Sequence, residues 1–222
     1  MDKSLKGFIF DLDGVITDTS RLHYAAWKVI TDKLKLPFNE EINERLKGVS
    51  RMESLEIILE RSDKKYLEQE KLKIADEKNN IYREFVNQLN EKDLFPGVNG
   101  LLTELNKKGW KLAIGSASRN AKTIIKKLGI EQFFDYIVDV DKVYASKPHP
   151  DIFVNAANEM NLVCNECIVV EDSIAGILAA KRAGMFTVGI GDRKRLTEAD
   201  FVYKRINQIN PEVISSYIKQ KI

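Results

Sequence analysis

The chain has 222 residues, of which 44% are hydrophobic, and its 35 basic and 33 acidic residues leave a net charge of +2. That length and composition are enough for a large buried core. The near balance of charges excludes a nucleic-acid surface built on an excess of basic residues. Residues 1–10 lack the apolar core of an export signal, and no stretch reaches the ~20 apolar residues of a membrane span. We therefore expect a cytoplasmic protein without nucleic-acid or membrane partners.

The first element in chain order is an apolar run that ends in two carboxylates. Residues 7–12 predict a short buried strand, because a bounded apolar run with aromatic and β-branched residues fits a parallel sheet. Residues i and i+2 of a strand point the same way, so Asp11 and Asp13 converge where the strand ends and Gly14 turns the chain. Two like charges held together need a cation or a shared proton.

The middle of the chain predicts a block of helices. Residues 20–90 read as almost wholly helical, and apolar residues recur there at helical spacing, as at Leu55, Ile58 and Leu59. From Leu94 onward, helix and strand patterns alternate, which implies right-handed crossovers and a parallel sheet covered on both faces. We expect strands at 111–115, 136–140, 168–171 and 187–190, and helices beginning after Gly97 and at 121–128, 151–160 and 174–183.

This order of elements predicts an α/β fold with a Rossmann-like parallel sheet core and an inserted all-helical cap domain. The core comprises residues 1–17 and 93–222, and the cap comprises residues 18–92. Ligands of open parallel sheets bind at the carboxyl ends of the strands, which is where Asp11, Ser116 and Asp172 are expected.

A second apolar run ends in Glu171 and Asp172, late in the chain. A third acidic group beside Asp11 and Asp13 would complete a site for a hard cation, and carboxylate oxygens suit Mg²⁺. Taken alone, an Asp-x-Asp pair is common in turns and helix caps, so the distant acidic pair and Lys147 carry the prediction. The lone pair Cys164 and Cys167 lacks the second ligand pair of a zinc site, and we expect reduced thiols there.

Four short motifs occur in order along the chain: Asp11-Leu12-Asp13-Gly14, Ser116-Ala117-Ser118, Lys147-Pro148 and Glu171-Asp172. In this order they resemble the signatures of the haloacid dehalogenase superfamily of phosphotransferases. Finer matches resemble its hexose-phosphate mutases and lie at residues 13–19, His23, 47–51, 78–79 and 116–118. The resemblance implies an isomerase that converts β-glucose 1-phosphate to glucose 6-phosphate through β-glucose 1,6-bisphosphate and an aspartyl-phosphate enzyme. It also implies Mg²⁺ as cofactor and sugar phosphates as partners, and we expect a monomer.

The resemblance also implies roles for the core residues. Asp11 is the expected nucleophile and Asp13 the general acid and base, which requires that the Asp13 side chain is free of the metal. The metal would be held by Asp11, a backbone carbonyl of Asp13 and Asp172, with Glu171 in or near its shell. Ser116 and Lys147 would stabilise the transferring phosphate. The family motif has lysine where this chain has Arg119, which keeps the charge and changes the geometry.

The cap is expected to contain the residues that distinguish a mutase of the family from a phosphatase. Arg51 would bind the phosphate that is not being transferred, helped by Arg119 and Asn120. The full set of expected substrate contacts is His23, Trp27, Lys47, Gly48, Val49, Ser50, Arg51, Ser54 and Lys78 from the cap, and Ser116, Ala117, Ser118, Arg119, Asn120 and Lys147 from the core. Without the resemblance, His23 would read as a structural residue and Ser118 as a helix cap.

Two alternatives stay open from the sequence. The first is a Mg²⁺-dependent phosphatase of the same superfamily that acts on small sugar phosphates. The second is a catalytically silent binding protein on this fold, which the intact Asp11, Asp13, Lys147 and Asp172 disfavour.

Overall fold

The computed structural model describes residues 5–138 and 140–221, and its centre is a six-stranded parallel sheet. The strands are β1 (Gly7–Phe10), β2 (Lys111–Ile114), β3 (Tyr136–Ile137), β4 (Cys167–Glu171), β5 (Phe186–Ile190) and β6 (Phe201–Tyr203). Their order across the sheet is β3-β2-β1-β4-β5-β6, with every neighbouring pair parallel. The chain leaves β1 in one direction and returns on its other side at β4, so the switch point lies between these two strands.

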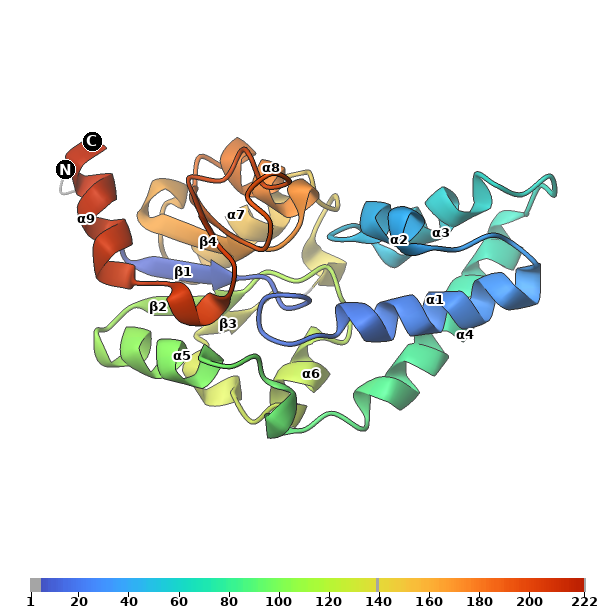
Figure 1. The fold of residues 1–222 in the computed structure, drawn as a ribbon, viewed down its shortest axis with the longest axis horizontal. Coiled ribbons are helices and arrows are strands. Elements are labelled where there is room, and N and C mark those ends of the chain that lie inside the picture. The colour runs from blue at the N-terminus through green and yellow to red at the C-terminus, as the bar shows by residue number, and fades with distance from the viewer. Residues whose placement is uncertain (1–4, 139, 222) are drawn as a thin grey trace.

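Helices cover both faces of this sheet. Helices α5 (Val98–Lys107), α6 (Ala121–Lys127) and α9 (Pro211–Lys221) pack on one face, and α7 (Asp151–Glu159) and α8 (Ile174–Arg182) pack on the other (Figure 1). The central strands β1 and β4 are therefore buried along their whole length. Only continuous apolar runs fit such a position, which explains their sequences.

The four remaining α-helices form the cap, which lies beyond the carboxyl ends of the strands (Figure 1). They are α1 (Ser20–Leu34), α2 (Glu40–Leu46), α3 (Arg51–Leu59) and α4 (Glu68–Val86). The cap has a hydrophobic cluster of its own, centred on buried side chains that include Trp27, Ile30, Leu55 and Ile58. A capping box of Ser50 and Glu53 fixes the start of α3.

The two chain segments that connect core and cap lie side by side. The Phe95 amide donates to the Ile16 carbonyl at 3.0 Å, and the Thr17 hydroxyl donates to the Asp93 carbonyl at 2.6 Å. Thr17 also forms an antiparallel bridge with Leu94. We propose this doubled connection as the domain boundary, which matches the division into 1–17 and 93–222 against 18–92.

The predicted α/β fold with its helical insertion is confirmed, and most predicted elements agree with the structure within a residue or two. The predicted strand 136–140 is wrong in length, because β3 ends at Ile137, Val140 begins a 3-10 turn and residue 139 lies outside the described residues. Strand β6 and helix α9 were not predicted. The 3-10 turns are Glu91–Asp93, Glu131–Phe133, Val140–Lys142, Cys164–Glu166 and Ile206–Gln208. Within the described ranges, no helix has the length and apolar character to cross a membrane.

Candidate active site

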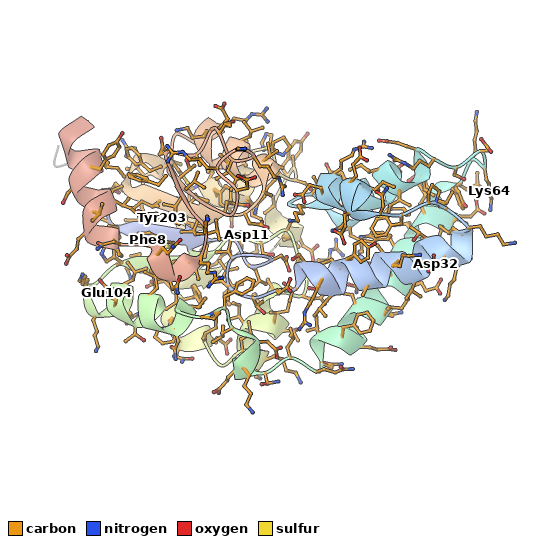
Figure 2. All side chains as sticks on the ribbon, in the orientation of Figure 1. Phe8, Asp11, Asp32, Lys64, Glu104 and Tyr203 are labelled. Carbon is orange, nitrogen blue, oxygen red and sulfur yellow. The ribbon has the colours of Figure 1, made fainter. Side chains whose placement is uncertain are left out.

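The candidate site lies where β1, β2 and β4 end beneath the cap. Asp11 follows β1, Ser116 follows β2, and Glu171 is the last residue of β4 with Asp172 next to it. Figure 2 shows Asp11 at the end of the sheet that faces the cap, whereas Asp32 and Lys64 lie far out on the cap. The switch point of the sheet therefore coincides with the acidic residues, as expected for a ligand site on this topology.

Lys147 is buried between two carboxylates. Its Nζ lies 2.6 Å from Oδ1 of Asp11 and 2.6 Å from Oε1 of Glu171, and none of its side chain is exposed. Burial alone would lower the pKa of Lys147, but the attraction of Asp11 and Glu171 raises that pKa above its usual range. The lysine is therefore permanently protonated, and it places a positive charge next to Asp11.

Glu171 is held on both of its oxygens. Oε1 accepts from Lys147, and Oε2 accepts from the Ser173 amide at 2.7 Å and the Ser173 hydroxyl at 2.8 Å. A Cβ on Gly176 would lie 1.8 Å from Oε1 of Glu171, so only glycine fits at that position. Glu171 thus orients Lys147 directly, and its place among the metal ligands stays a prediction.

Asp13 has a different environment from Asp11. The Thr19 hydroxyl donates to Oδ1 of Asp13, and Nε2 of His23 lies 3.7 Å from the same oxygen. Desolvation raises the pKa of Asp13, although the hydrogen bond from Thr19 acts in the opposite direction. A raised pKa favours the protonated carboxyl, which is the form that a general acid requires.

His23 of α1 contacts Lys78 of α4 inside the cap. Nζ of Lys78 lies 2.7 Å from Nδ1 of His23 and 5.2 Å from the ring centroid of Trp27. Burial, with the nearby charges of Lys78 and Arg51, lowers the pKa of His23 well below its usual value, so the imidazole is neutral. In the tautomer in which Nδ1 accepts from Lys78, the ring hydrogen sits on Nε2, which faces Asp13.

The acidic side chains fit a hard cation. Asp172 is close to Gly14, where a Cβ would lie 2.3 Å from Oδ2 of Asp172. The φ of 85° at this position also favours glycine. Burial, with the charges of Glu171 and Asp13, raises the pKa of Asp172 to about 7, although Lys47 lowers it. The cluster is therefore short of positive charge.

Within the described residues, no three His, Cys, Asp or Glu side chains converge as a ready-made metal group. Two carboxylates and one backbone carbonyl would leave open positions for water, and Mg²⁺ commonly keeps several waters.

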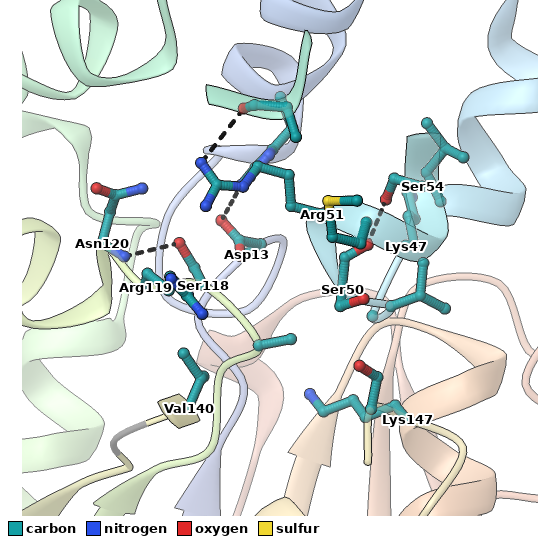
Figure 3. Close-up of a pocket in the computed structure, with 18 of the residues that line it drawn as sticks. Asp13, Lys47, Ser50, Arg51, Ser54, Ser118, Arg119, Asn120, Val140 and Lys147 are labelled. Atoms are coloured by element: carbon teal, nitrogen blue, oxygen red, sulfur yellow. Dashed lines mark hydrogen bonds and ion pairs between the residues drawn. The ribbon is translucent and has the colours of Figure 1, made fainter. Parts of the chain in front are cut away.

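The cap and core enclose a cavity of about 570 Å³ above these carboxylates (Figure 3). The expected substrate residues that line it are His23, Trp27, Lys47, Gly48, Val49, Ser50, Arg51, Ser54, Lys78, Ala117, Ser118, Arg119, Asn120 and Lys147, together with Asp11, Asp13 and Asp172. Ser116 and Glu171 lie behind this lining. Ser116 accepts a hydrogen bond from the Ser118 amide at 3.1 Å and so shapes the loop that reaches the cavity.

Two arginines face the cavity from opposite sides. Arg51 of the cap donates to the Ala75 carbonyl at 3.3 Å and lies 3.8 Å from Oδ1 of Asp76. Arg119 of the core lies 2.7 Å from Oδ1 of Asp141. Burial lowers the pKa of Arg51, the charge of Asp76 opposes this change, and the positive charge of Arg119 adds a smaller decrease. Like charges that face each other in this way favour an anion between them.

The loop formed by residues 47–50 brings the cap close to the core. A Cβ on Gly48 would lie 2.8 Å from the Ser173 hydroxyl, and the φ of 76° there also favours glycine. Nζ of Lys47 lies 3.6 Å from Oδ2 of Asp172 and 3.4 Å from Oε2 of Glu44. Glu44 in turn pairs with Arg195 of the core, which ties α2 to the loop after β5.

Comparison with known proteins identifies the family. The haloacid dehalogenase-like hydrolase family matches residues 8–190 of the chain. This chain belongs to the haloacid dehalogenase-like hydrolase family.

Among its relatives in this family, a β-phosphoglucomutase of Bacillus subtilis is 42% identical over 95% of this chain and 94% of that protein. A phosphorylated carbohydrates phosphatase of Thermotoga maritima is 31% identical over 97% of this chain and 99% of that protein. The crystal structure of a β-phosphoglucomutase from Clostridium difficile has a TM-score of 0.94 and 42% identity, and the match covers 98% of each chain. Haloacid dehalogenase-like phosphoglucomutases depend on a metal ion.

Sequence reasoning missed several residues that line the cavity. They are Ser20, Asn43, Leu46, Met52, Leu72, Ala75, Asp76, Val140, Val143, Tyr144, Ala145, Ser146 and Ile152. Asn79 bridges cap and core, because Nδ2 of Asn120 donates to its side-chain oxygen at 3.1 Å. Tyr144 is 92% exposed although it lines the cavity, and a lone aromatic residue in a loop gives no signal of this position.

Proposed function

We propose that this member of the haloacid dehalogenase-like family is a β-phosphoglucomutase that interconverts β-glucose 1-phosphate and glucose 6-phosphate. The observation that carries the proposal is a cavity with the pair of Asp11 and Lys147 at one end and two arginines that line it from the cap and the core. These arginines are Arg51 and Arg119. Such a cavity suits a substrate with two phosphates, which a mutase passes through as a bisphosphate. Near full-length similarity to β-phosphoglucomutases supports the same assignment.

We propose Asp11 as the nucleophile. Its carboxylate attacks phosphorus and gives an aspartyl phosphate, while the bond between phosphorus and the sugar oxygen breaks. Lys147 neutralises charge on the phosphoryl oxygens, and Ser116 positions the loop that binds them. Asp11, the Asp13 carbonyl and Asp172 would hold Mg²⁺, which supplies further charge neutralisation when bound.

We propose Asp13 as the acid and base of the transfer. It gives a proton to the leaving sugar oxygen and takes one from the sugar hydroxyl that attacks next, and its raised pKa suits the first role. Thr19 and His23 contact its carboxylate and would orient it. Lys78 keeps the neutral His23 ring in place.

The cap would exclude water and hold the second phosphate. Arg51 can grip a phosphate with two parallel hydrogen bonds, and Arg119 and Asn120 complete the contact from the core. The wall around the sugar would be formed by the remaining cap residues of the cavity, namely Trp27, Lys47, Gly48, Val49, Ser50 and Ser54. We also propose that the protein works as a cytoplasmic monomer on small sugar phosphates.

A product-resolved assay tests the proposal. The protein is incubated with β-glucose 1-phosphate, Mg²⁺ and a trace of β-glucose 1,6-bisphosphate, and both glucose 6-phosphate and inorganic phosphate are measured. The proposal expects glucose 6-phosphate to dominate. Inorganic phosphate as the main product would instead support the phosphatase alternative. The similarity to the Thermotoga maritima phosphatase is the observation that favours this alternative.

A further inference from the structure

Tyr82 of α4 carries a polar group that the residues discussed so far do not explain. Its side chain is fully buried, and its hydroxyl has no hydrogen-bond partner of good geometry among the described residues. Asn155 on α7 and Ser215 on α9 also carry such an atom, but neither lines the cavity. A buried hydroxyl without a partner costs stability, so its retention calls for a reason.

The surroundings of Tyr82 point to the acid–base residue. The tyrosine ring stacks on the His23 ring with centroids 4.0 Å apart, and Nζ of Lys78 lies 4.6 Å from the tyrosine centroid. Burial and the charge of Asp13 raise the pKa of Tyr82, and the neighbouring hydroxyls of Thr19 and Ser118 act in the opposite direction. Tyr82 therefore sits between the residues that contact Asp13 and the loop that reaches the phosphate site.

The hydrogen-bonding capacity of Thr19 makes its hydroxyl oxygen a suitable acceptor for the Tyr82 hydroxyl. Thr19 is fully buried, and its single hydroxyl hydrogen is donated to Oδ1 of Asp13. The lone pairs of the Thr19 oxygen can still accept a hydrogen bond, and water has no access to them. The Tyr82 O–H is a buried donor without a well-formed hydrogen bond among the described residues, and the Thr19 hydroxyl is one of its two neighbouring hydroxyls. A bond from Tyr82 would fix the direction in which the Thr19 hydroxyl points.

We propose that Tyr82 is a positioning residue whose hydroxyl donates to the Thr19 oxygen when substrate is bound, so that Thr19 holds the Asp13 carboxylate in line with the reacting sugar oxygen. This inference rests on the proposed function in one respect, the acid–base role of Asp13. The phenyl ring and the hydroxyl have separate tasks in this arrangement. The ring packs against His23 and Lys78, and the hydroxyl acts on Thr19.

The test compares Tyr82→Phe in two backgrounds. Turnover of β-glucose 1-phosphate is counted as the sum of glucose 6-phosphate and inorganic phosphate, in the presence of Mg²⁺. In the wild-type background, Tyr82→Phe should lower kcat about ten-fold, the size of one lost hydrogen bond, and leave KM within about two-fold. The melting temperature should not fall, because the variant loses an unpaired hydroxyl. Tyr24→Phe in α1 is the matched control and should leave kcat unchanged.

In a Thr19→Val background, Tyr82→Phe should have almost no additional effect, because the hydroxyl through which Tyr82 acts is already missing. An equal loss of kcat in both backgrounds would overturn the inference, as would an unchanged kcat in Tyr82→Phe. Loss of the effect in a Ser118→Ala background but not in Thr19→Val would place Tyr82 on the phosphate loop and also overturn it.

These outcomes are separable from failure of the proposed function. If the wild-type protein releases phosphate in place of glucose 6-phosphate, the mutase assignment fails, and the Tyr82 comparison is still read on total turnover. A wild-type protein with no turnover of either kind would overturn both.

Discussion

The ammonium of Lys147 lies 2.6 Å from Oδ1 of Asp11, with 0% and 7% of the two side chains exposed. Burial raises the pKa of Asp11 well above its usual value, and the charge of Lys147 is the first influence that opposes this rise. Because only the ionised carboxylate is a nucleophile, Lys147 has a task before any substrate binds. It favours the ionised form of the Asp11 carboxyl inside the protein.

Replacing Lys147 should therefore reveal a pH-dependent loss of stability. In Lys147→Met, Asp11 and Glu171 lose their buried counterion, which should cost about 3–5 kcal/mol of the free energy of unfolding at neutral pH. The pKa of Asp11 then rises further in the folded state, so the folded protein binds more protons than the unfolded chain and loses stability as pH rises. Denaturant unfolding of the metal-free protein at pH 5 and pH 8 measures this. A loss that is equal at both pH values would contradict the assignment.

Replacing Asp11 should abolish phosphoryl transfer without unfolding the protein. Asp11→Asn is nearly isosteric but removes the nucleophilic oxygen anion, and turnover should fall by roughly 10⁴-fold or more. The exposed neighbour Asp18 provides a matched control, and Asp18→Asn should keep wild-type turnover. Substantial mutase turnover in Asp11→Asn, from a preparation free of wild-type protein, would count against the nucleophile.

Asp172 should control the metal requirement. Removing the metal with a chelator should stop turnover, and added Mg²⁺ should restore it. In Asp172→Ala, the Mg²⁺ concentration for half-maximal turnover should rise at least about ten-fold, since even outer-shell losses cost that much at metal sites. A titration of turnover against Mg²⁺ gives the result directly, and identical curves for the two proteins would argue that Asp172 is not a ligand.

The buried Lys78 should make the stability of the wild-type protein rise with pH. This is the opposite of the pH dependence expected for Lys147→Met. Burial, with a smaller contribution from Arg51, lowers the pKa of Lys78 to about 7, below its usual ~10.4. Between these values the unfolded chain binds more protons than the folded protein, so stability from this residue rises with pH. The free energy of unfolding of wild type should rise between pH 7 and pH 9, and Lys78→Met should lack roughly 2–3 kcal/mol of this rise. Lys65→Met on the exposed cap surface is the control and should show no such difference.

The sequence predicted the parts of the site that depend on local order. Strand β1 and the carboxylates Asp11 and Asp13 follow from one apolar run and the two-residue period of a strand. The same holds for β4 and Glu171. The cap could be predicted because no strand pattern interrupts residues 20–90.

The parts that sequence could not predict depend on contacts between distant segments. Nothing near Tyr82 in the sequence indicates that its ring stacks on His23, 59 positions earlier. The pairing of Arg119 with Asp141 depends on two loops that meet only in the folded protein. Strand β6 at the edge of the sheet is only three residues long, and so short an apolar run does not by itself indicate a strand.

The central claim is that one cavity serves a substrate with two phosphates, and Arg51 tests it most directly. The measurement is the ratio of glucose 6-phosphate formation to hydrolysis of a small phosphate that lacks a second phosphoryl group, in wild type, Arg51→Ala and Arg51→Lys. A bidentate contact is worth about 3 kcal/mol, so Arg51→Ala should lower the ratio roughly a hundred-fold, and Arg51→Lys should recover only part of it. A ratio that stays the same in all three proteins would show that Arg51 does not bind the second phosphate, and the account would be contradicted.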